Sequence, residues 1–126
     1  MVEALYDNGN VITKTGEASI TDAIKNVSVV MVYFSMHHCP PCQAFTPVLA
    51  DLYNEYNADE KKFEVIFMSG DRTDEEYNKY YAEMPWLAVP RGDSRIGKLA
   101  KQFAVKGVPR LIVLKSDGKV ISDDAV

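Results

Sequence analysis

The sequence contains little cysteine and tryptophan, and it has no long hydrophobic run. Its 126 residues include only two cysteines and one tryptophan. The longest apolar run covers residues 29–34, far short of the roughly 20 residues that a membrane-spanning helix requires. Residues 1–10 contain no basic segment followed by an apolar one, which is the pattern of a secretory signal. These absences predict a cytoplasmic protein with no membrane partner.

The sequence also lacks an excess of basic charge. Lys and Arg number 14 against 18 Asp and Glu, which gives a net charge of -4. Because no basic stripe is present, we expect no nucleic-acid partner. The 47% hydrophobic and 25% charged residues are typical of globular proteins and exclude collagen, low-complexity and rod-like chains. No repeat or linker divides the chain, so the sequence predicts one domain over residues 1–126.

Strand and helix patterns alternate along the chain. Apolar runs rich in β-branched and aromatic residues predict strands at 11–13, 29–35, 63–68, 111–114 and 119–122. Helices are predicted after Ser19, after the Pro40-Pro41 pair, after Thr73, and after Asp93 or Ser94. A strand–helix–strand unit gives a parallel pair with a right-handed crossover, and the final hairpin adds antiparallel strands. The predicted architecture is α/β, with a mixed central β-sheet and helices on both faces.

Apolar residues in the helices follow the helical period and predict which faces are buried. In the second helix the spacing predicts one buried face made of Phe45, Val48, Leu49, Leu52, Tyr53 and Tyr56. In the third helix the predicted core residues are Tyr77, Tyr80, Tyr81 and Met84. Trp86 is interpreted as a packing residue below the mouth of the site described next.

The feature that carries chemistry is the segment Cys39-Pro40-Pro41-Cys42, which follows a buried strand and opens a helix. Two thiols at this spacing can form and break a disulfide, because the second sulfur stays within reach of a mixed disulfide made by the first. Unpaired N–H groups and the positive end of the helix dipole favour the thiolate form of Cys39. Both prolines stiffen the loop and remove competing donors. The motif therefore indicates reversible dithiol chemistry.

Other segments of the chain accompany this motif. They are Tyr-Phe-Ser at 33–35, Phe-Thr-Pro at 45–47, Phe-Glu-Val-Ile-Phe at 63–67, Tyr-Tyr-Ala-Glu-Met-Pro-Trp-Leu-Ala-Val-Pro at 80–90, and Val-Pro at 108–109. With them, the sequence resembles the thioredoxin superfamily, and within it the tryparedoxin and nucleoredoxin branch, from about residue 29 to residue 118. The resemblance implies a thioredoxin-like three-layer sandwich and a thiol–disulfide oxidoreductase that reduces protein disulfides.

The resemblance also implies roles for individual residues. Cys39 would be the attacking thiol and Cys42 the resolving thiol, with a cis peptide bond between Val108 and Pro109 beside them. No cofactor is expected. The implied partners are disulfide-containing proteins, peroxidases among them, together with a low-molecular-weight thiol or flavoprotein that supplies electrons. The family continues with a helix after the final hairpin, and this sequence stops at Val126.

The chain departs from the family around the dithiol. His38, Arg91 and Arg110 stand where the family commonly has Trp, an aromatic residue and Thr, and residues 69–72 lack another family Trp. The rim of the site therefore exchanges aromatic rings for cations. Our hypothesis is that this rim favours an anionic partner or further stabilises the Cys39 thiolate. His38 is either a solvated side chain or a titrating neighbour of that thiolate.

Two other interpretations remain open at this point. A thioredoxin-fold module could bind a partner through the altered rim without redox turnover. A metal site could use His37, His38, Cys39 and Cys42, but four ligands within six residues can hardly surround one ion. No metal is therefore expected within one chain, and only a site bridging two molecules stays open. Covalent haem attachment is excluded, because Gln43 follows the second cysteine where histidine is needed.

Overall fold

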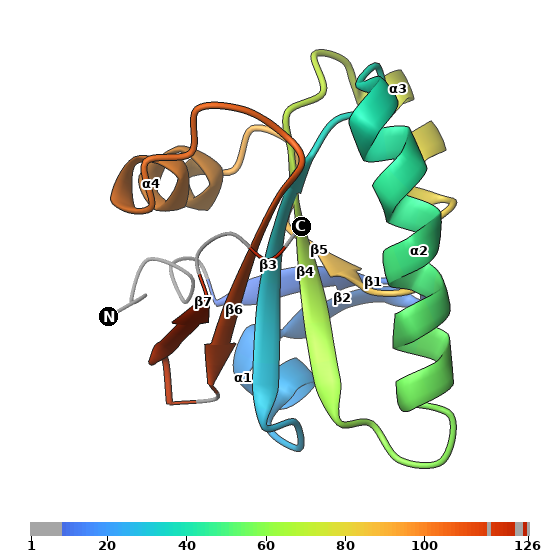
Figure 1. Ribbon diagram of the computed structural model, residues 1–126, viewed down its shortest axis with the longest axis vertical. Coiled ribbons are helices and arrows are strands. Elements are labelled where there is room, and N and C mark those ends of the chain that lie inside the picture. Colours follow the sequence, from blue (N-terminus) through green and yellow to red (C-terminus); the bar gives the residue numbers. More distant parts are fainter. Residues whose placement is uncertain (1–8, 116, 123–124, 126) are drawn as a thin grey trace.

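A computed structural model gives the structure of residues 9–115, 117–122 and 125 (Figure 1). Residues 1–8 lie outside the described residues, and they make up most of the segment that was searched for a secretory signal. Residues 1 and 126, the bounds of the predicted domain, also lie outside the described residues. In the described part of the chain, no helix is long and apolar enough to cross a membrane. The elements in chain order are β1 (Asn10–Thr13), β2 (Gly16–Ser19), α1 (Ile20–Ile24), β3 (Val29–Ser35), α2 (Pro40–Tyr56), β4 (Phe63–Ser69), α3 (Asp74–Tyr81), β5 (Leu87–Ala88), α4 (Ser94–Gln102), β6 (Arg110–Lys115) and β7 (Val120–Ser122).

The strands form one mixed sheet in the order β2-β1-β5-β4-β3-β6-β7. β3 and β4 run parallel and are joined by α2, as the strand–helix–strand pattern predicts. β6 pairs antiparallel with β3, with Phe34 opposite Arg110, and β7 returns along β6. The sequence missed β2, which forms a hairpin with β1, and the two-residue strand β5. The predicted α/β class with a mixed sheet is confirmed.

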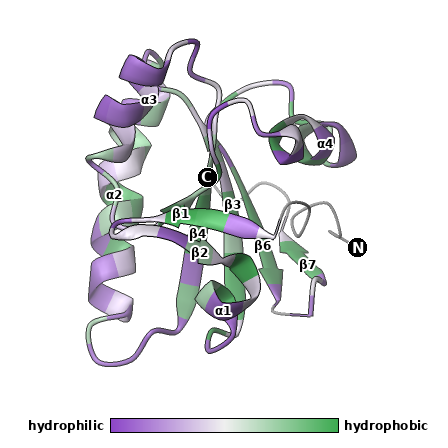
Figure 2. Cartoon of the chain, turned by 180° about the vertical axis from the view of Figure 1, so that it is seen from behind, coloured by the Kyte–Doolittle hydropathy of each residue, from purple (hydrophilic) through white to green (hydrophobic). Residues whose placement is uncertain are grey.

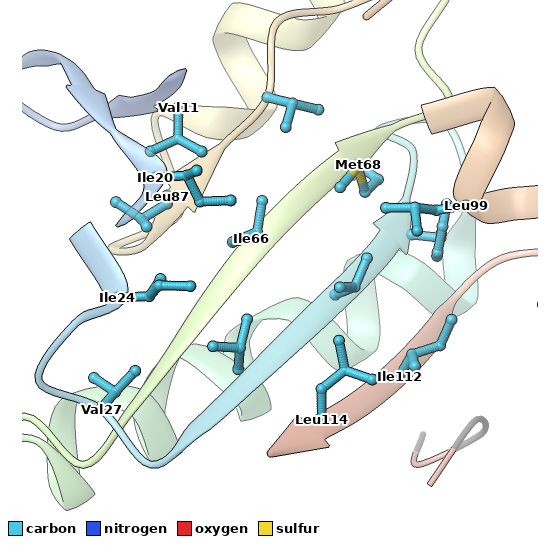
Figure 3. Close-up of a cluster of buried hydrophobic side chains, with 14 residues drawn as sticks. Val11, Ile20, Ile24, Val27, Ile66, Met68, Leu87, Leu99, Ile112 and Leu114 are labelled. Atoms are coloured by element: carbon cyan, nitrogen blue, oxygen red, sulfur yellow. The ribbon is translucent and has the colours of Figure 1, made fainter. Parts of the chain in front are cut away.

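One face of the sheet is covered by α1 and α4 and has an aliphatic core (Figure 1). Figure 3 shows Ile66, Met68 and Ile112 reaching from the sheet toward Leu99 of α4 and the residues of α1. Burying one such side chain contributes roughly 1.5–3 kcal/mol. We call this group of buried side chains the aliphatic cluster; its members are Val11, Ile20, Ile24, Val27, Val30, Val32, Phe34, Ile66, Met68, Leu87, Val89, Leu99, Ile112 and Leu114.

The opposite face is covered by α2 and α3 and has an aromatic core. Figure 2 shows the hydrophobic strands in the middle of the molecule and the hydrophilic outer turns of α3. The three tyrosines predicted as core in this helix are buried, which confirms that part of the stripe. Met84 is buried as predicted, but it lies beyond the end of α3 and not in the helix. We call the buried side chains of this face the aromatic cluster; its members are Tyr33, Leu49, Tyr53, Val65, Phe67, Tyr77, Tyr80, Tyr81, Met84, Trp86, Ala88 and Leu111.

The predicted buried face of α2 is wrong in part. Leu49 and Tyr53 are buried, but Val48 is 53% exposed, Leu52 41% and Tyr56 54%. The helix is turned so that Cys42, the first residue of its buried stripe, faces the protein. Steps of four, three and four residues from there place Thr46, Leu49 and Tyr53 on the sheet side. The apolar pattern was wider than the surface that the sheet can cover.

The helix starts follow the expected capping chemistry with one exception. The Thr73 hydroxyl accepts the N–H of Glu76 at the start of α3, and the Asp93 carboxylate caps α4. Ser19 precedes α1 but makes no side-chain cap. The sequence did not predict that Arg95 is fully buried. Its guanidinium donates to Asp93 and to the carbonyl of Asn10, which compensates the burial of its charge.

Candidate active site

Cys39 lies where the chain leaves the sheet and enters α2. It is the N-cap residue of this helix, and its sulfur accepts a hydrogen bond from the backbone N–H of Cys42 at 3.3 Å. Pro40 follows in the first helical turn, where a missing N–H costs nothing. The side chain of Cys39 thus occupies the place at which the helix start binds an anion. Both cysteines are free thiols.

The two sulfurs differ in access. Cys39 keeps 9% of its surface exposed, whereas Cys42 has none. Burial raises the pKa of the Cys42 thiol to about 11, and the neighbouring Cys39 contributes to the increase. A hydrogen bond from Ser35 favours the thiolate of Cys42 and opposes this shift. A dissolved molecule therefore reaches Cys39 first, and Cys42 reacts only with what is already attached there.

A chain of buried hydroxyl groups lies beneath Cys42. The Tyr80 hydroxyl is 2.5 Å from the Ser35 hydroxyl and 2.6 Å from that of Thr46, which in turn is 2.7 Å from Tyr33. The Tyr80 hydroxyl also donates to the carbonyl of Cys42 at 3.5 Å. Burial raises the pKa of Tyr33 and of Tyr80, so these phenols are protonated and able to donate at neutral pH. The sequence placed Tyr80 in the core but gave no sign of this connection.

The segment before β6 forms the other wall of the site. The Val108–Pro109 peptide bond is cis, as the resemblance implies. The carbonyl oxygen of Val108 lies 3.6 Å from the Cys39 sulfur, so the structure brings these residues together from 69 positions apart. Arg110 follows, and its guanidinium donates to the carbonyl of Phe103 at the end of α4. The guanidinium of Arg110 is thus bonded to the backbone of the same chain.

Two histidines precede the dithiol on the loop from β3. The His38 ring nitrogen Nε2 is 2.6 Å from a carboxylate oxygen of Glu76 in α3, and its side chain is 69% exposed. The backbone N–H of His37 donates to Asp71 at 2.6 Å, and its carbonyl accepts from Gln43. Because Glu76 lies 38 positions along the sequence, its place beside His38 was not predicted.

The cationic rim is less available than the sequence indicated. Arg91 is paired with Asp74 at 2.7 Å and also donates to the carbonyl of Arg72. His38 is paired with Glu76. These side chains therefore meet carboxylates and carbonyls of the same chain, which reduces their attraction for an anionic partner.

Trp86 lies away from the chemistry, in the aromatic cluster. Its ring centroid is 5.9 Å from that of Tyr33 and 5.8 Å from that of Tyr53, both in edge-to-face geometry. It is 1% exposed, and no partner for its indole N–H is present among the described residues. Packing is therefore the interaction that the structure shows for this side chain.

The fold, with its paired thiols at a helix start, is that of a thioredoxin-like domain. The chain belongs to the thioredoxin-like family, whose model matches residues 26–120. This membership agrees with the resemblance seen in the sequence.

Relatives of the tryparedoxin and nucleoredoxin branch align with nearly the whole chain. Probable nucleoredoxin 1 of Arabidopsis thaliana is 40% identical over 127 residues, which cover 98% of this chain but only 22% of that protein. Tryparedoxin of Trypanosoma brucei brucei is 39% identical over 118 residues, covering 92% of this chain and 80% of that protein. A solved structure of tryparedoxin II complexed with glutathionylspermidine superposes with a TM-score of 0.81 at 36% identity, covering 91% of this chain and 80% of that one.

Proposed function

We propose that this chain reduces disulfide bonds in protein partners through Cys39 and Cys42. The observation that carries the proposal is the difference between the two sulfurs. Cys39, at the start of α2, keeps 9% of its surface exposed, whereas Cys42, one turn behind it, is fully buried. An incoming disulfide therefore meets Cys39 before Cys42, which lies next to it in the first turn of the helix and is placed to resolve a mixed disulfide.

The reaction has two exchange steps. The Cys39 thiolate attacks one sulfur of the partner's disulfide, forms a mixed disulfide, and releases the partner's other sulfur as a thiolate. Cys42 then loses its proton and attacks the sulfur of Cys39, which releases the second partner thiolate. The partner gains two electrons, and the chain is left with a Cys39–Cys42 disulfide.

The surroundings of Cys42 support its place in the second step. Burial holds it protonated at neutral pH, since its pKa is raised to about 11. It therefore does not compete for the partner's disulfide in the first step. The Ser35 hydroxyl, backed by Tyr80, favours the thiolate when the proton leaves.

Electrons must then be returned to the dithiol by another thiol. We propose a low-molecular-weight thiol or a flavoprotein for this step, and disulfide-containing proteins such as peroxidases as the substrates. The tryparedoxin II structure complexed with glutathionylspermidine supports a small-thiol donor for its relatives. A reducing compartment such as the cytoplasm suits a dithiol of this kind. The two thiols carry out this exchange without a cofactor. We propose that residues 1–126 form one domain.

Insulin reduction by dithiothreitol tests the activity. We expect the wild-type chain to accelerate precipitation of the reduced insulin chains and Cys39→Ser to abolish that acceleration. Cys42→Ser should accumulate a mixed disulfide that survives on a non-reducing gel. Val48→Ser, on the exposed side of α2, is the matched control and should retain activity. A wild-type chain without activity would favour the module that binds without turnover.

The electron donor can be tested with the oxidised chain. Glutathione-type thiols and a flavoprotein reductase with NADPH are each added in turn, and the appearance of the two thiols is followed with a thiol reagent. A donor of the proposed class should restore both thiols within the time of the insulin assay. Failure of both classes would exclude this part of the proposal and leave the first step untouched.

A further inference from the structure

Three potential metal ligands converge beside the dithiol. One nitrogen each of His37 and His38 and one carboxylate oxygen of Glu76 lie within 4.8 Å of one another. A search of the described residues for three or more histidine, cysteine or acidic side chains that could surround an ion gives this group. Cys39 and Cys42 are not members of it. The structure therefore replaces the four-ligand set considered from the sequence with a different set.

The imidazole of His37 gives a second, independent observation. Its Nδ1 atom is buried and has no hydrogen-bond partner among the described residues. A buried nitrogen left in this state costs roughly 1–3 kcal/mol. The ring is packed between His38 at 5.1 Å and Tyr80 at 5.5 Å, measured between ring centroids. A metal ion, or a water molecule on that ion, would provide the missing partner.

The backbone holds both halves of the group in place. The backbone N–H of His37 is fixed by Asp71, and its carbonyl is fixed by the side chain of Gln43. Glu76 lies in the first turn of α3, where its own N–H is capped by Thr73. The two ligand-bearing segments are thus anchored, and the exposed His38 side chain already contacts the Glu76 carboxylate.

We propose that His37, His38 and Glu76 form a zinc site at the rim of the dithiol. Two imidazoles and one carboxylate are ligands that zinc accepts in proteins, with a fourth position left for water. Bonds of about 2.0–2.2 Å place tetrahedral ligands about 3.3–3.5 Å apart, so the three atoms must close by at most about 1.5 Å. His38 and Glu76, now 2.6 Å apart, move slightly apart to admit the ion. This site is independent of the proposed disulfide chemistry.

The thiols must be removed before the site is measured, because thiolates bind zinc themselves. The Cys39→Ser/Cys42→Ser double variant provides this background in the full chain. Zinc is titrated against a chromogenic chelator, and we expect one equivalent to bind. His37→Ala, His38→Ala and Glu76→Gln should each lower the affinity by at least about tenfold, the minimum that loss of even an outer-shell partner costs.

A matched control lies one residue away. Glu75→Gln removes a carboxylate from the same helical turn, but Glu75 faces Lys79 and is not part of the group. It should leave the zinc affinity unchanged. Cobalt added to the double variant should give the absorption of a tetrahedral ion. Zinc should also raise the melting temperature of the double variant and not that of its His38→Ala derivative.

The proposal is overturned by any of three results. These are the absence of saturable zinc binding in the double variant, binding that His37→Ala and His38→Ala leave unchanged, and binding that falls equally in Glu75→Gln. Circular dichroism of each variant separates loss of the site from loss of the fold. A variant that unfolds is replaced by its glutamine counterpart, such as His37→Gln, which keeps a polar side chain at the position.

Discussion

The two faces of the sheet are packed by different chemistry. The aliphatic cluster, under α1 and α4, consists of side chains without ionisable groups. The aromatic cluster, under α2 and α3, contains tyrosines whose hydroxyls find partners inside the protein. The hydroxyl of Tyr80, on the aromatic face, bonds Ser35 and the carbonyl of Cys42, and Ser35 in turn bonds the buried Cys42 thiol.

This difference indicates that the aliphatic cluster stabilises the fold, whereas the aromatic cluster also influences the reactivity of the thiols. An aliphatic core can be repacked with little consequence beyond stability, because its contacts are non-directional. A network of buried hydroxyls is directional, and each lost partner leaves another group unsatisfied. We therefore expect changes in the aliphatic cluster to affect stability alone, and changes in the aromatic cluster to affect stability and reactivity together.

The largest effect is expected at high pH, where buried groups on the α2 and α3 side of the sheet ionise and the aliphatic cluster has none to ionise. Burial raises the pKa of Tyr77 to about 12 and of Cys42 to about 11, from ordinary values of 10.0 and 9.0. Their protonated forms therefore stabilise the fold fully below about pH 9, and this contribution is lost as pH rises through the raised values. The urea midpoint should be flat to about pH 9 and then fall steeply toward pH 12. The change in ultraviolet absorbance that accompanies deprotonation of tyrosine should occur together with unfolding. A urea midpoint that stays constant to pH 11 would contradict the prediction.

Truncation of one large side chain on each face compares their packing. Trp86→Ala should cost about 3–5 kcal/mol and Leu99→Ala about 2–5 kcal/mol in the free energy of unfolding. Both residues are at most 1% exposed, so neither site can relax into solvent. Urea unfolding measures the cost, and insulin reduction measures the activity of the folded fraction. Trp86→Ala should lower that activity through Tyr33, which packs on Trp86 and belongs to the hydroxyl chain beneath Cys42. An equal loss of activity in Leu99→Ala would contradict the separation of roles.

Removing the Tyr80 hydroxyl tests the connection to the dithiol. Tyr80→Phe leaves Ser35 and Thr46 short of a partner and should cost about 1–3 kcal/mol. It should also slow release of the mixed disulfide and shift the pH dependence of that step upward. Tyr77→Phe is the matched control, since its hydroxyl bonds the carbonyl of Val89 instead. Equal rates of release in the two variants would remove Tyr80 from the reaction.

The smallest effect is expected on the outer side of α2. Leu52→Ala should change stability by no more than about 0.5 kcal/mol, because Leu52 is 41% exposed. Leu49→Ala, one turn away on the buried side, should cost about 2–5 kcal/mol. Thermal or urea unfolding of the pair checks the orientation of the helix. Similar losses for both variants would show that Leu52 is covered in solution.

Much of the fold could be predicted because its signals are local. The apolar run of β3 and the prolines at the start of α2 lie within a few residues of what they specify. The two-residue strand β5 is too short to carry a period, and the burial of Arg95 depends on a carbonyl 85 positions earlier. Patterns within one segment cannot reveal either.

The candidate site divides in the same way. The spacing of Cys39 and Cys42 and their place at a helix start can be recognised within four residues. The partners of the site come from elsewhere: Glu76 meets His38, and Tyr80 meets Ser35, only after α3 has packed beside α2. Such contacts depend on tertiary packing, which cannot be predicted from the local pattern of a single sequence.

The buried guanidinium of Arg95 has a consequence for the order in which the chain assembles. It binds the carbonyl of Asn10, at the first residue of the hairpin β1–β2, and Ile12 in the same strand pairs with Ala88. Tyr81 also bonds the segment, through the Ile12 carbonyl and the Lys14 ammonium, so on the ribosome the hairpin emerges before all of these partners. Because β1 joins the sheet by pairing with β5, the hairpin can take its place in the sheet only after β5 has been synthesised, and the Arg95 bond can form only after that.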